Sequence, residues 1–303
     1  MKIYRRLSEI DFTLSELPKV RAPRRVLMTA PTHFQVEYVI NPHMAGNIGG
    51  VDPEVAQGQW DRLRGTYETL GVETHTLPGV AGLPDMVFCA NQTLPVPARF
   101  RGSDVYGADP SVILSRMFSE HRRQEVDSYE AFFGAQGYLP RNLKYGLGSF
   151  EGMGDAIWHP GRLLLWGGHG FRTDPQVYGR LSDALDVKIL TIRLEDPYFY
   201  HLDTCFSVLS ESTVLICPAA FDADGLALIH ALFEHVIEAP EDESRGLFAC
   251  NAHCPDGRHV IIQRGSTRTN ALLVAAGFEP VEVDTDQFMM AGGSVFCMKQ
   301  MFW

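Results

Sequence analysis

The chain has 303 residues, of which 45% are hydrophobic, and a formal net charge of −11 at pH 7. A chain of this length buries a full core, and the acidic balance argues against general affinity for nucleic acid or anionic membranes, which reward clustered Lys and Arg. No apolar run approaches a membrane span, and the basic N-terminus lacks the apolar stretch of a signal peptide. Six cysteines in so long a chain predict reduced thiols, so a cytoplasmic protein is expected.

One plan recurs five times along the chain: a β-branched or aliphatic strand, an amphipathic helix and a second strand. The first strands are expected at residues 25–28, 111–114, 162–166, 213–216 and 259–262. The helices, with apolar residues at three- and four-residue spacing, follow at residues 59–70, 125–134, 176–184, 226–233 and 269–276. The second strands are expected at residues 72–77, 138–139, 188–192, 235–237 and 280–283. Additional short strands are predicted at residues 86–88 and 204–209.

A period of roughly 45 to 70 residues is longer than that of common solenoid repeats. Because no Gly/Ser-rich or Pro-rich linker divides the chain, we expect one α/β domain over residues 1–303, with five modules closed into a ring around a central site. An open doubly wound sheet is the alternative, since it also alternates strands and helices. The chain offers no Gly-rich phosphate loop for the nucleotide site of such a sheet.

Cys297 is a candidate nucleophile near the end of the chain. Gly292 and Gly293 precede it, and they let the backbone turn sharply or approach closely before a short apolar strand that would deliver the thiol. A cysteine with a distant histidine and several acids is a pattern typical of nucleophilic catalysis.

Three further motifs could supply partners for this thiol. His201 and Asp203 lie at the start of an expected strand, whose alternation would send both side chains to the same face. Glu151 and Asp155 flank glycines that allow close approach of the backbone to a ligand. Each motif alone is also compatible with a strand end or a simple turn.

The last motif is the segment from Asp85 to Asn91, in which these two residues bracket the expected short strand. Together, in the order acid, acid, His-x-Asp and Cys, the motifs resemble the pentein or guanidine-modifying superfamily of arginine deiminases, dimethylarginine dimethylaminohydrolases, amidinotransferases and arginine dihydrolases. The resemblance covers roughly residues 25 to 300. It implies a five-bladed α/β propeller of pseudo-fivefold repeated modules around a central active site.

The resemblance also implies roles for the catalytic residues. Cys297 would be the nucleophile, His201 the general acid/base, and Glu151 the carboxylate that contacts substrate and orients the histidine. Asp203 would hold guanidinium nitrogens. A thiolate would attack the guanidino carbon, and His201 would protonate the departing ammonia and then activate water against a covalent thiouronium intermediate. No metal or organic cofactor is implied, and the partner is a small guanidino compound.

Further residues are implied to bind the substrate. Asp85 matches a pocket acid of the dimethylarginine hydrolases, and Phe88 belongs to the same segment. Arg172 matches the arginine that grips the substrate's α-carboxylate, and either Arg122 or Arg123 is a candidate for a second clamp.

Asn91 departs from the deiminases, which carry an aspartate there. Asn91 and the stretch of residues 32–44, which includes Asn41, both resemble the arginine dihydrolases. These enzymes convert arginine to ornithine. The resemblance implies that Asn41 and Asn91 face the substrate. An amide donates and accepts hydrogen bonds, so it tolerates both arginine and the neutral ureido group of citrulline. The segment from Glu151 to Asp155 carries one residue more than the matching deiminase motif, which leaves the role of Asp155 open.

Several alternatives stay open at this point. A dimethylarginine hydrolase or a deiminase would stop at citrulline, and an amidinotransferase would pass the amidino group to an amine. Cys250, His253, Cys254 and His259 have a spacing that could bind structural zinc. A papain-like protease is disfavoured because its cysteine lies near the mature N-terminus. A ring-shaped binding protein that had lost its reaction is the non-enzymatic alternative, and a homo-oligomer is compatible with every case.

Overall fold

Five parallel strand pairs organise this computed structural model, which describes residues 2–97, 99–101, 104–106, 110–142 and 148–303. In each pair a helix connects the two strands, because adjacent parallel strands need a crossover connection. The units are β2 (Arg25–Thr29), α1 (Pro53–Thr69) and β3 (Glu73–Leu77); β7 (Ser111–Leu114), α2 (Glu125–Ala135) and β8 (Leu139–Asn142); β10 (Leu164–His169), α4 (Gln176–Leu185) and β11 (Lys188–Arg193); β13 (Thr213–Ile216), α5 (Ala223–Leu232) and β14 (His235–Glu238); and β15 (His259–Gln263), α7 (Thr267–Ala275) and β16 (Glu279–Val283). The predicted strand–helix–strand order is confirmed in all five units.

An antiparallel strand extends four of these pairs. These strands are β17 (Gln300–Phe302) beside β2, β4 (Thr93–Val96) beside β7, β9 (Ala156–Trp158) beside β10, and β12 (Phe206–Val208) beside β13. The fifth pair has an isolated antiparallel bridge between His253 and Ile261. Strand β1 (Ile3–Tyr4) runs parallel to β11, and β5 (Arg99–Arg101) pairs with β6 (Asp104–Tyr106). Four units therefore contain a small mixed sheet, and the fifth contains a parallel strand pair with one antiparallel bridge.

Short helices connect these sheets. The α-helical ones are α3 (Gly152–Asp155), α6 (Glu241–Leu247) and α8 (Asp286–Met289). The 3₁₀ helices are η1 (Leu7–Glu9), η2 (Leu14–Glu16), η3 (Pro42–Met44), η4 (Pro84–Val87), η5 (Glu120–Arg122), η6 (Pro197–Phe199), η7 (Leu202–Thr204) and η8 (Pro218–Ala220).

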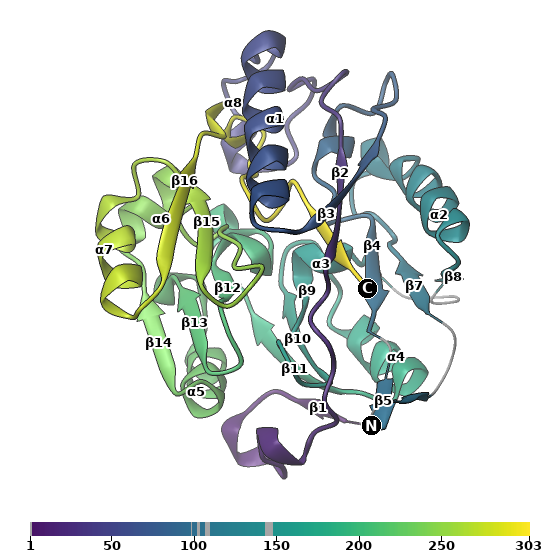
Figure 1. Cartoon of the computed structure of the whole chain (residues 1–303), viewed down its shortest axis with the longest axis vertical. Helices are drawn as coiled ribbons and strands as arrows, with labels where there is room; N and C mark the ends of the chain where they lie inside the picture. The colour runs from purple at the N-terminus through teal and green to yellow at the C-terminus, as the bar shows by residue number, and fades with distance from the viewer. Residues whose placement is uncertain (1, 98, 102–103, 107–109, 143–147) are drawn as a thin grey trace.

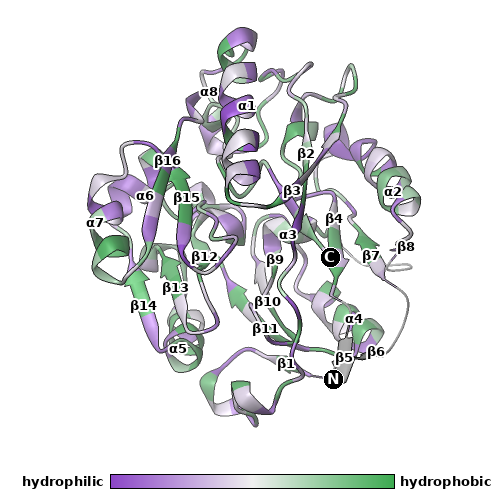
Figure 2. Cartoon of the chain, in the orientation of Figure 1, coloured by the Kyte–Doolittle hydropathy of each residue, from purple (hydrophilic) through white to green (hydrophobic). Residues whose placement is uncertain are grey.

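The sheets lie around the middle of the molecule, with α1, α2, α5 and α7 toward its periphery (Figure 1). Inner strands such as β7, β10 and β13 are mainly hydrophobic, whereas α1 mixes polar and apolar residues, as a helix with one face in water does (Figure 2). One large cluster of buried apolar side chains draws residues from Tyr4 to Phe296, so the core crosses the boundaries between units. Among the described residues, no helix is both long and apolar enough to cross a membrane.

The structure corrects three predicted strands. Residues 86–88 belong largely to η4, His201 and Asp203 lie at η7 rather than at a strand start, and Val295–Met298 form a turn that ends before β17. In each segment a short-range backbone bond replaces a ladder bond, namely Phe88 N to Asp85 O at 3.0 Å, Cys205 N to Leu202 O at 3.1 Å and Met298 N to Ser294 O at 3.1 Å. A short apolar run cannot by itself separate a strand from a buried turn. The strand expected over 204–209 is real but shorter, as β12.

Candidate active site

The turn at residues 295–298 presents Cys297, which is 2% exposed. Gly292 lies just before it with φ +92°, a backbone conformation that favours glycine. A Cβ at Gly293 would lie 2.4 Å from the Phe88 ring and 3.0 Å from the Cys297 Cβ. The predicted reason for the two glycines, a sharp turn with close approach, is therefore confirmed, although the segment after them is not a strand.

Two side chains hold the Cys297 thiol. The Sγ atom donates to Asp203 Oδ2 at 3.2 Å, and Asn251 Nδ2 donates to Sγ at 3.2 Å. Burial and the Asp203 carboxylate raise the pKa of Cys297 well above its usual value, against the smaller effect of Asn251. The thiol is consequently protonated in this arrangement, and a cation beside it would favour the thiolate.

The η7 helix places His201 and Asp203. His201 is the residue before the helix, and Asp203 lies in its first turn. Burial raises the pKa of Asp203 to about 7, although Cys297 donates to it, and its Oδ1 has no hydrogen-bond partner among the described residues. An unpartnered buried acceptor suits a ligand with several N–H donors.

Glu151 is fully buried between His201 and Arg172. Its Oε2 lies 2.6 Å from His201 Nε2 and 3.2 Å from Arg172 Nη1, and its Oε1 accepts from Phe118 N at 2.9 Å. Burial alone would raise the pKa of Glu151, but Arg172 and His201 outweigh it and hold the pKa well below its usual value. The charged carboxylate therefore fixes the orientation of the His201 ring.

Arg172 has further partners beyond Glu151. Its Nη2 donates to Ile40 O at 2.7 Å, and its guanidinium lies 4.8 Å from the centroid of the Tyr200 ring. Arg172 is therefore a buried guanidinium with protein partners on several sides.

Asp85 and Arg122 form a second buried charge group. Tyr38 donates to Asp85 Oδ2 at 2.9 Å, Arg122 Nε lies 4.0 Å from the same oxygen, and Asp85 Oδ1 has no hydrogen-bond partner in the described part of the chain. Arg122 is held by Glu125, whose Oε2 lies 2.9 Å from its Nη2. Burial raises the pKa of Asp85, against the effects of Arg122 and Tyr38.

Asn91 lies beside this group and shows a defined amide orientation. Its Oδ1 accepts from Arg122 Nη1 at 2.9 Å, while its Nδ2 has no hydrogen-bond partner within the described ranges. A Cβ at Gly154 would lie 2.3 Å from that nitrogen and 3.4 Å from the His201 ring. The glycine therefore leaves room for an N–H donor next to His201.

These groups meet at a small cavity of about 10 Å³, which holds about one water molecule. It is lined by Ile40, Asn41, Met44, Asp85, Phe88, Asn91, Arg122, Arg172, Tyr200, Ala291 and Cys297. Asp203 and Glu151 lie behind this lining, bonded to Cys297 and Arg172 respectively, and His201 is bonded to Glu151. An arginine-sized molecule needs more space, so side chains around the cavity must move to admit it.

Three predicted residues have geometries that limit their roles. Asn41 lines the cavity, but its amide caps η3 through His43 N and Met44 N and donates to Ala291 O at 3.0 Å. Arg123 is exposed and pairs with Glu120 at 3.0 Å, so Arg122 is the member of the pair at the site. Asp155 Oδ1 accepts from Leu202 N at 3.0 Å and so holds the first residue of η7. Burial raises the pKa of Asp155 to about 6.

Asn251, Tyr200 and Tyr38 are site residues that the sequence did not single out. Asn251 donates to the thiol, but no motif around it in the sequence marks it as a partner of Cys297. Tyr200 precedes His201 directly, which was an available signal. Tyr38 lies within residues 32–44, a stretch that resembles the arginine dihydrolases. That resemblance did not single out Tyr38 among these residues.

The proposed zinc cluster does not assemble. His253 Nδ1 lies 3.0 Å from the Tyr67 hydroxyl, His259 Nδ1 lies 2.6 Å from Asp256, and Cys250 lies 3.5 Å from Ser244 Oγ. Among the described residues, no group of three or more His, Cys, Asp and Glu is placed to hold a metal ion.

Residues 51–302 match the family described as N,N dimethylarginine dimethylhydrolase, eukaryotic. The N(G),N(G)-dimethylarginine dimethylaminohydrolase of Mycobacterium tuberculosis is 35% identical over 92% of this chain and 87% of its own length. The chain belongs to this family. The family comprises hydrolases that act on guanidino carbon–nitrogen bonds, so the protein is an enzyme of that class.

A second kind of relative is equally similar. The bifunctional arginine dihydrolase/ornithine cyclodeaminase ArgZ of Synechocystis is 36% identical over 90% of this chain and only 37% of its own length. The N-terminal domain of ArgZ, solved as an asparagine-to-serine variant covalently bound to a reaction intermediate, has a TM-score of 0.83 with 34% identity and covers 91% of this chain and 97% of that domain. A dimethylarginine dimethylaminohydrolase adduct, at 21% identity and a TM-score of 0.74, shows the same fold. The mixed α/β fold of this family is thereby established.

Proposed function

We propose that this protein is an arginine dihydrolase, which converts arginine and two water molecules to ornithine, carbon dioxide and two ammonia molecules. The observation that carries the proposal is the orientation of Asn91, whose unpartnered Nδ2 lies beside His201 while its oxygen is held by Arg122. The resemblance of the chain to the ArgZ domain supports it.

The first hydrolysis begins with binding of the guanidinium. The unpartnered Oδ1 atoms of Asp85 and Asp203 are acceptors for its planar N–H groups, and its positive charge favours the thiolate of Cys297. Sulfur attacks the guanidino carbon, His201 protonates the departing ammonia, and water activated by His201 breaks the carbon–sulfur bond to leave citrulline. Arg172 is the proposed partner of the α-carboxylate, and Arg122 a candidate for the second contact.

The second hydrolysis requires that citrulline stay in the site. Its ureido oxygen is an acceptor, to which Asn91 Nδ2 can donate, whereas an aspartate at this position offers only acceptors. Cys297 then attacks the ureido carbon, a second ammonia leaves, and hydrolysis of the remaining carbonyl attachment gives ornithine and carbon dioxide. Asn91 thereby selects the end product.

The test is a product count. Incubation with arginine is expected to yield ornithine and ammonia in a ratio of one to two, with Cys297→Ser as the inactive control. In Asn91→Asp we expect citrulline to accumulate, with formation of ornithine reduced about 100-fold or more, the loss of a transition-state hydrogen bond in a buried site. Citrulline as the sole product of the unaltered enzyme would contradict the dihydrolase assignment.

Dimethylarginine hydrolysis is the second candidate, because the Mycobacterium tuberculosis relative carries that name at 35% identity. It predicts release of dimethylamine from asymmetric dimethylarginine at a kcat/KM above that for arginine. Measurement of both substrates side by side separates the two candidates, since their products differ.

We also propose that the five sheets form a pseudo-fivefold α/β propeller in one domain that spans residues 1–303. The repeated strand–helix–strand units and the shared hydrophobic cluster support this arrangement. The six free thiols fit the reducing cytoplasm expected from the sequence. A homo-oligomer stays a prediction, and light scattering after size-exclusion chromatography tests it.

A further inference from the structure

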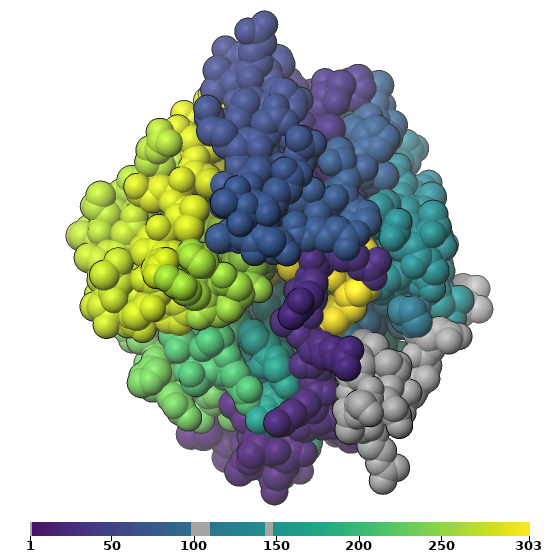
Figure 3. Space-filling view, viewed as in Figure 1, coloured from purple at the N-terminus to yellow at the C-terminus, as the bar shows by residue number. Residues whose placement is uncertain are grey.

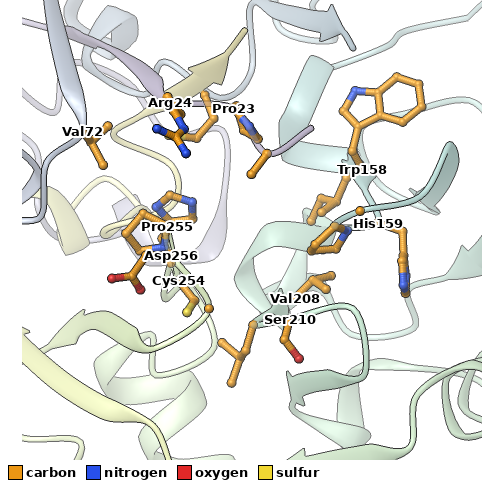
Figure 4. Close-up of a pocket in the computed structure, with 18 of the residues that line it drawn as sticks. Pro23, Arg24, Val72, Trp158, His159, Val208, Ser210, Cys254, Pro255 and Asp256 are labelled. Atoms are coloured by element: carbon orange, nitrogen blue, oxygen red, sulfur yellow. The ribbon is translucent and has the colours of Figure 1, made fainter. Parts of the chain in front are cut away.

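A second cavity, of about 580 Å³, lies apart from the catalytic one. It is walled by the N-terminal segment at residues 21–24, by residues 157–161 and 208–211, and by residues 253–257. In the space-filling view the C-terminal residues show inside a hollow beside the N-terminal segment (Figure 3), and the close-up shows Arg24, Trp158, Ser210 and Asp256 around the open space (Figure 4). Its volume is in the range of small-molecule sites.

The turn that carries Cys297 separates the two cavities. Cys297 lines the catalytic cavity, whereas its neighbours Phe296 and Lys299 line the larger one. None of the described residues lines both. The larger cavity is therefore a distinct space that shares only a short chain segment with the catalytic site.

Lys299 is the unusual residue of this cavity. Its side chain is fully buried, and its Nζ has no hydrogen-bond partner among the described residues, although it lies 3.1 Å from the centroid of the Phe296 ring. Burial lowers the pKa of Lys299 to about 7, even though Asp203 and Cys297 act in the opposite direction. A buried amine with three potential donors and no acceptor is costly, and an anionic ligand would supply the acceptor.

The remaining charges of the cavity leave it receptive to an anion. Its two acids already have side-chain partners: Asp256 lies 2.6 Å from His259 Nδ1, and Glu211 lies 2.6 Å from Arg162 Nε. The exposed Arg24 adds a positive charge to the wall. Much of the remaining wall is apolar, formed by Val72, Ile157, Trp158, Val208, Met301 and Trp303.

We propose that this cavity is a second binding site, which takes a small organic carboxylate with an apolar or aromatic body. The carboxylate would accept from Lys299 at the inner end, once this buried side chain turns its Nζ toward the cavity, and the body would pack against the apolar wall. The site does not depend on which guanidino compound the enzyme hydrolyses.

Fluorescence titration of the intact protein tests the site, because Trp158 and Trp303 both line the cavity. The probe is 3-phenylpropionate, and the neutral 3-phenylpropanamide is its matched control. We expect a saturable change in emission with the carboxylate and an affinity at least about tenfold lower for the amide, as the loss of one charge-assisted bond predicts. Equal affinity for both compounds, or no saturable change at millimolar concentration, would overturn the proposal.

Variants locate the probe. Lys299→Met keeps an unbranched side chain of similar length and should abolish the preference for the carboxylate. Ser210→Trp places a large side chain in the cavity from its partly exposed wall and should weaken the binding of both compounds. This variant tests the site even if Lys299→Met folds poorly. Arg172→Gln alters the catalytic cavity and should leave the affinity unchanged. Loss of binding in Arg172→Gln, with both cavity variants unaffected, would place the probe in the catalytic site and reject the inference.

Discussion

Asn251 uses both ends of its amide to position the Cys297 segment. Its Oδ1 accepts from Ser294 N at 3.0 Å and from Cys297 N at 3.3 Å, and its Nδ2 donates to Asp203 O at 2.8 Å as well as to the thiol. The thiol therefore has a defined position before any substrate binds. Pre-positioning of this kind removes part of the entropic cost of the attack.

Replacement of Asn251 by Ala should lower the free energy of unfolding by about 3 kcal/mol or more, because two backbone N–H groups and one carbonyl lose their buried partner. Urea unfolding measures this loss. Asn270→Ala, at a partly exposed position on α7, is the matched control and should change the value by less than about 1 kcal/mol. Equal effects of the two substitutions would contradict the assigned role.

Asp203 makes stability depend on pH. Its pKa is about 7 in the folded protein against an ordinary value of 3.8, so between these values the folded state holds a proton that the unfolded state has lost. The stabilising contribution of the Asp203 carboxyl to the free energy of unfolding is thus fully present below about pH 4 and is lost as the pH rises to about 7. Relative to Asp203→Asn, the unaltered protein should lose stability over this interval. Parallel curves of unfolding free energy against pH for the two proteins would refute this expectation.

At the scale of elements, the short helix α3 links the backbone packing of the fold to the residues of the candidate site. Gly152 has φ +49°, and a Cβ there would lie 2.5 Å from Thr93 O and 2.8 Å from Asn91 O. Met153 N donates to Ala90 O at 2.7 Å, which ties α3 to the segment that carries Asn91. These backbone contacts therefore fix the position of Glu151, the residue before α3, relative to Asn91.

Gly152→Ala should destabilise the protein by about 2 kcal/mol or more, through clash and an unfavourable φ. Gly65→Ala is the matched control, since Gly65 lies within α1 with nothing within 4 Å of a Cβ, and it should stabilise by about 0.5–1 kcal/mol. Thermal unfolding measures both, and shifts of the same sign would contradict this interpretation.

The sequence predicted the five βαβ units well because each has local periodicity and a short apolar strand, and three of them have a glycine just after the helix. Gly71, Gly137 and Gly277 each lie two residues after a helix end, and all have positive φ in the structure. Residues 86–88, 201–203 and 295–298 were predicted in strands, but the first two segments lie at 3₁₀ helices and the third is a turn, because their apolar residues are buried by tertiary contacts rather than by sheet pairing. Resemblance supplied the expected site residues, whereas the contacts of Asn251 and Lys299 exist only in the folded chain.

At the scale of the whole molecule, β17 joins the end of the described chain to its beginning. Gln300 pairs with Leu27 and Phe302 with Arg25, and Gln300 Nε2 also donates to Thr93 O at 3.0 Å. Phe302 is fully buried, with the Arg25 guanidinium 4.4 Å from its ring centroid and the Phe133 ring at 5.5 Å. These contacts hold the segment that follows Cys297.

Phe302→Ala should cost about 3–5 kcal/mol of stability, since it leaves a large cavity among aromatic rings. Val274→Ala, at a side chain that is 61% exposed, serves as the surface control and should change stability by less than about 0.5 kcal/mol. The activity of Phe302→Ala should fall at a lower temperature than that of the control, which an activity–temperature series detects. Identical thermal inactivation would show that β17 does not secure the nucleophile.

The pairing of β17 with β2 also has a consequence for biosynthesis. β17 follows β2 along the chain with four of the five units between them, so one edge of β2 stays unpaired until residues 300–302 have been synthesised. The newly made chain thus exposes this sheet edge while the four intervening units are synthesised. Because β17 closely follows Cys297 in the chain, we expect the thiol to reach its position in the same folding step that covers this edge.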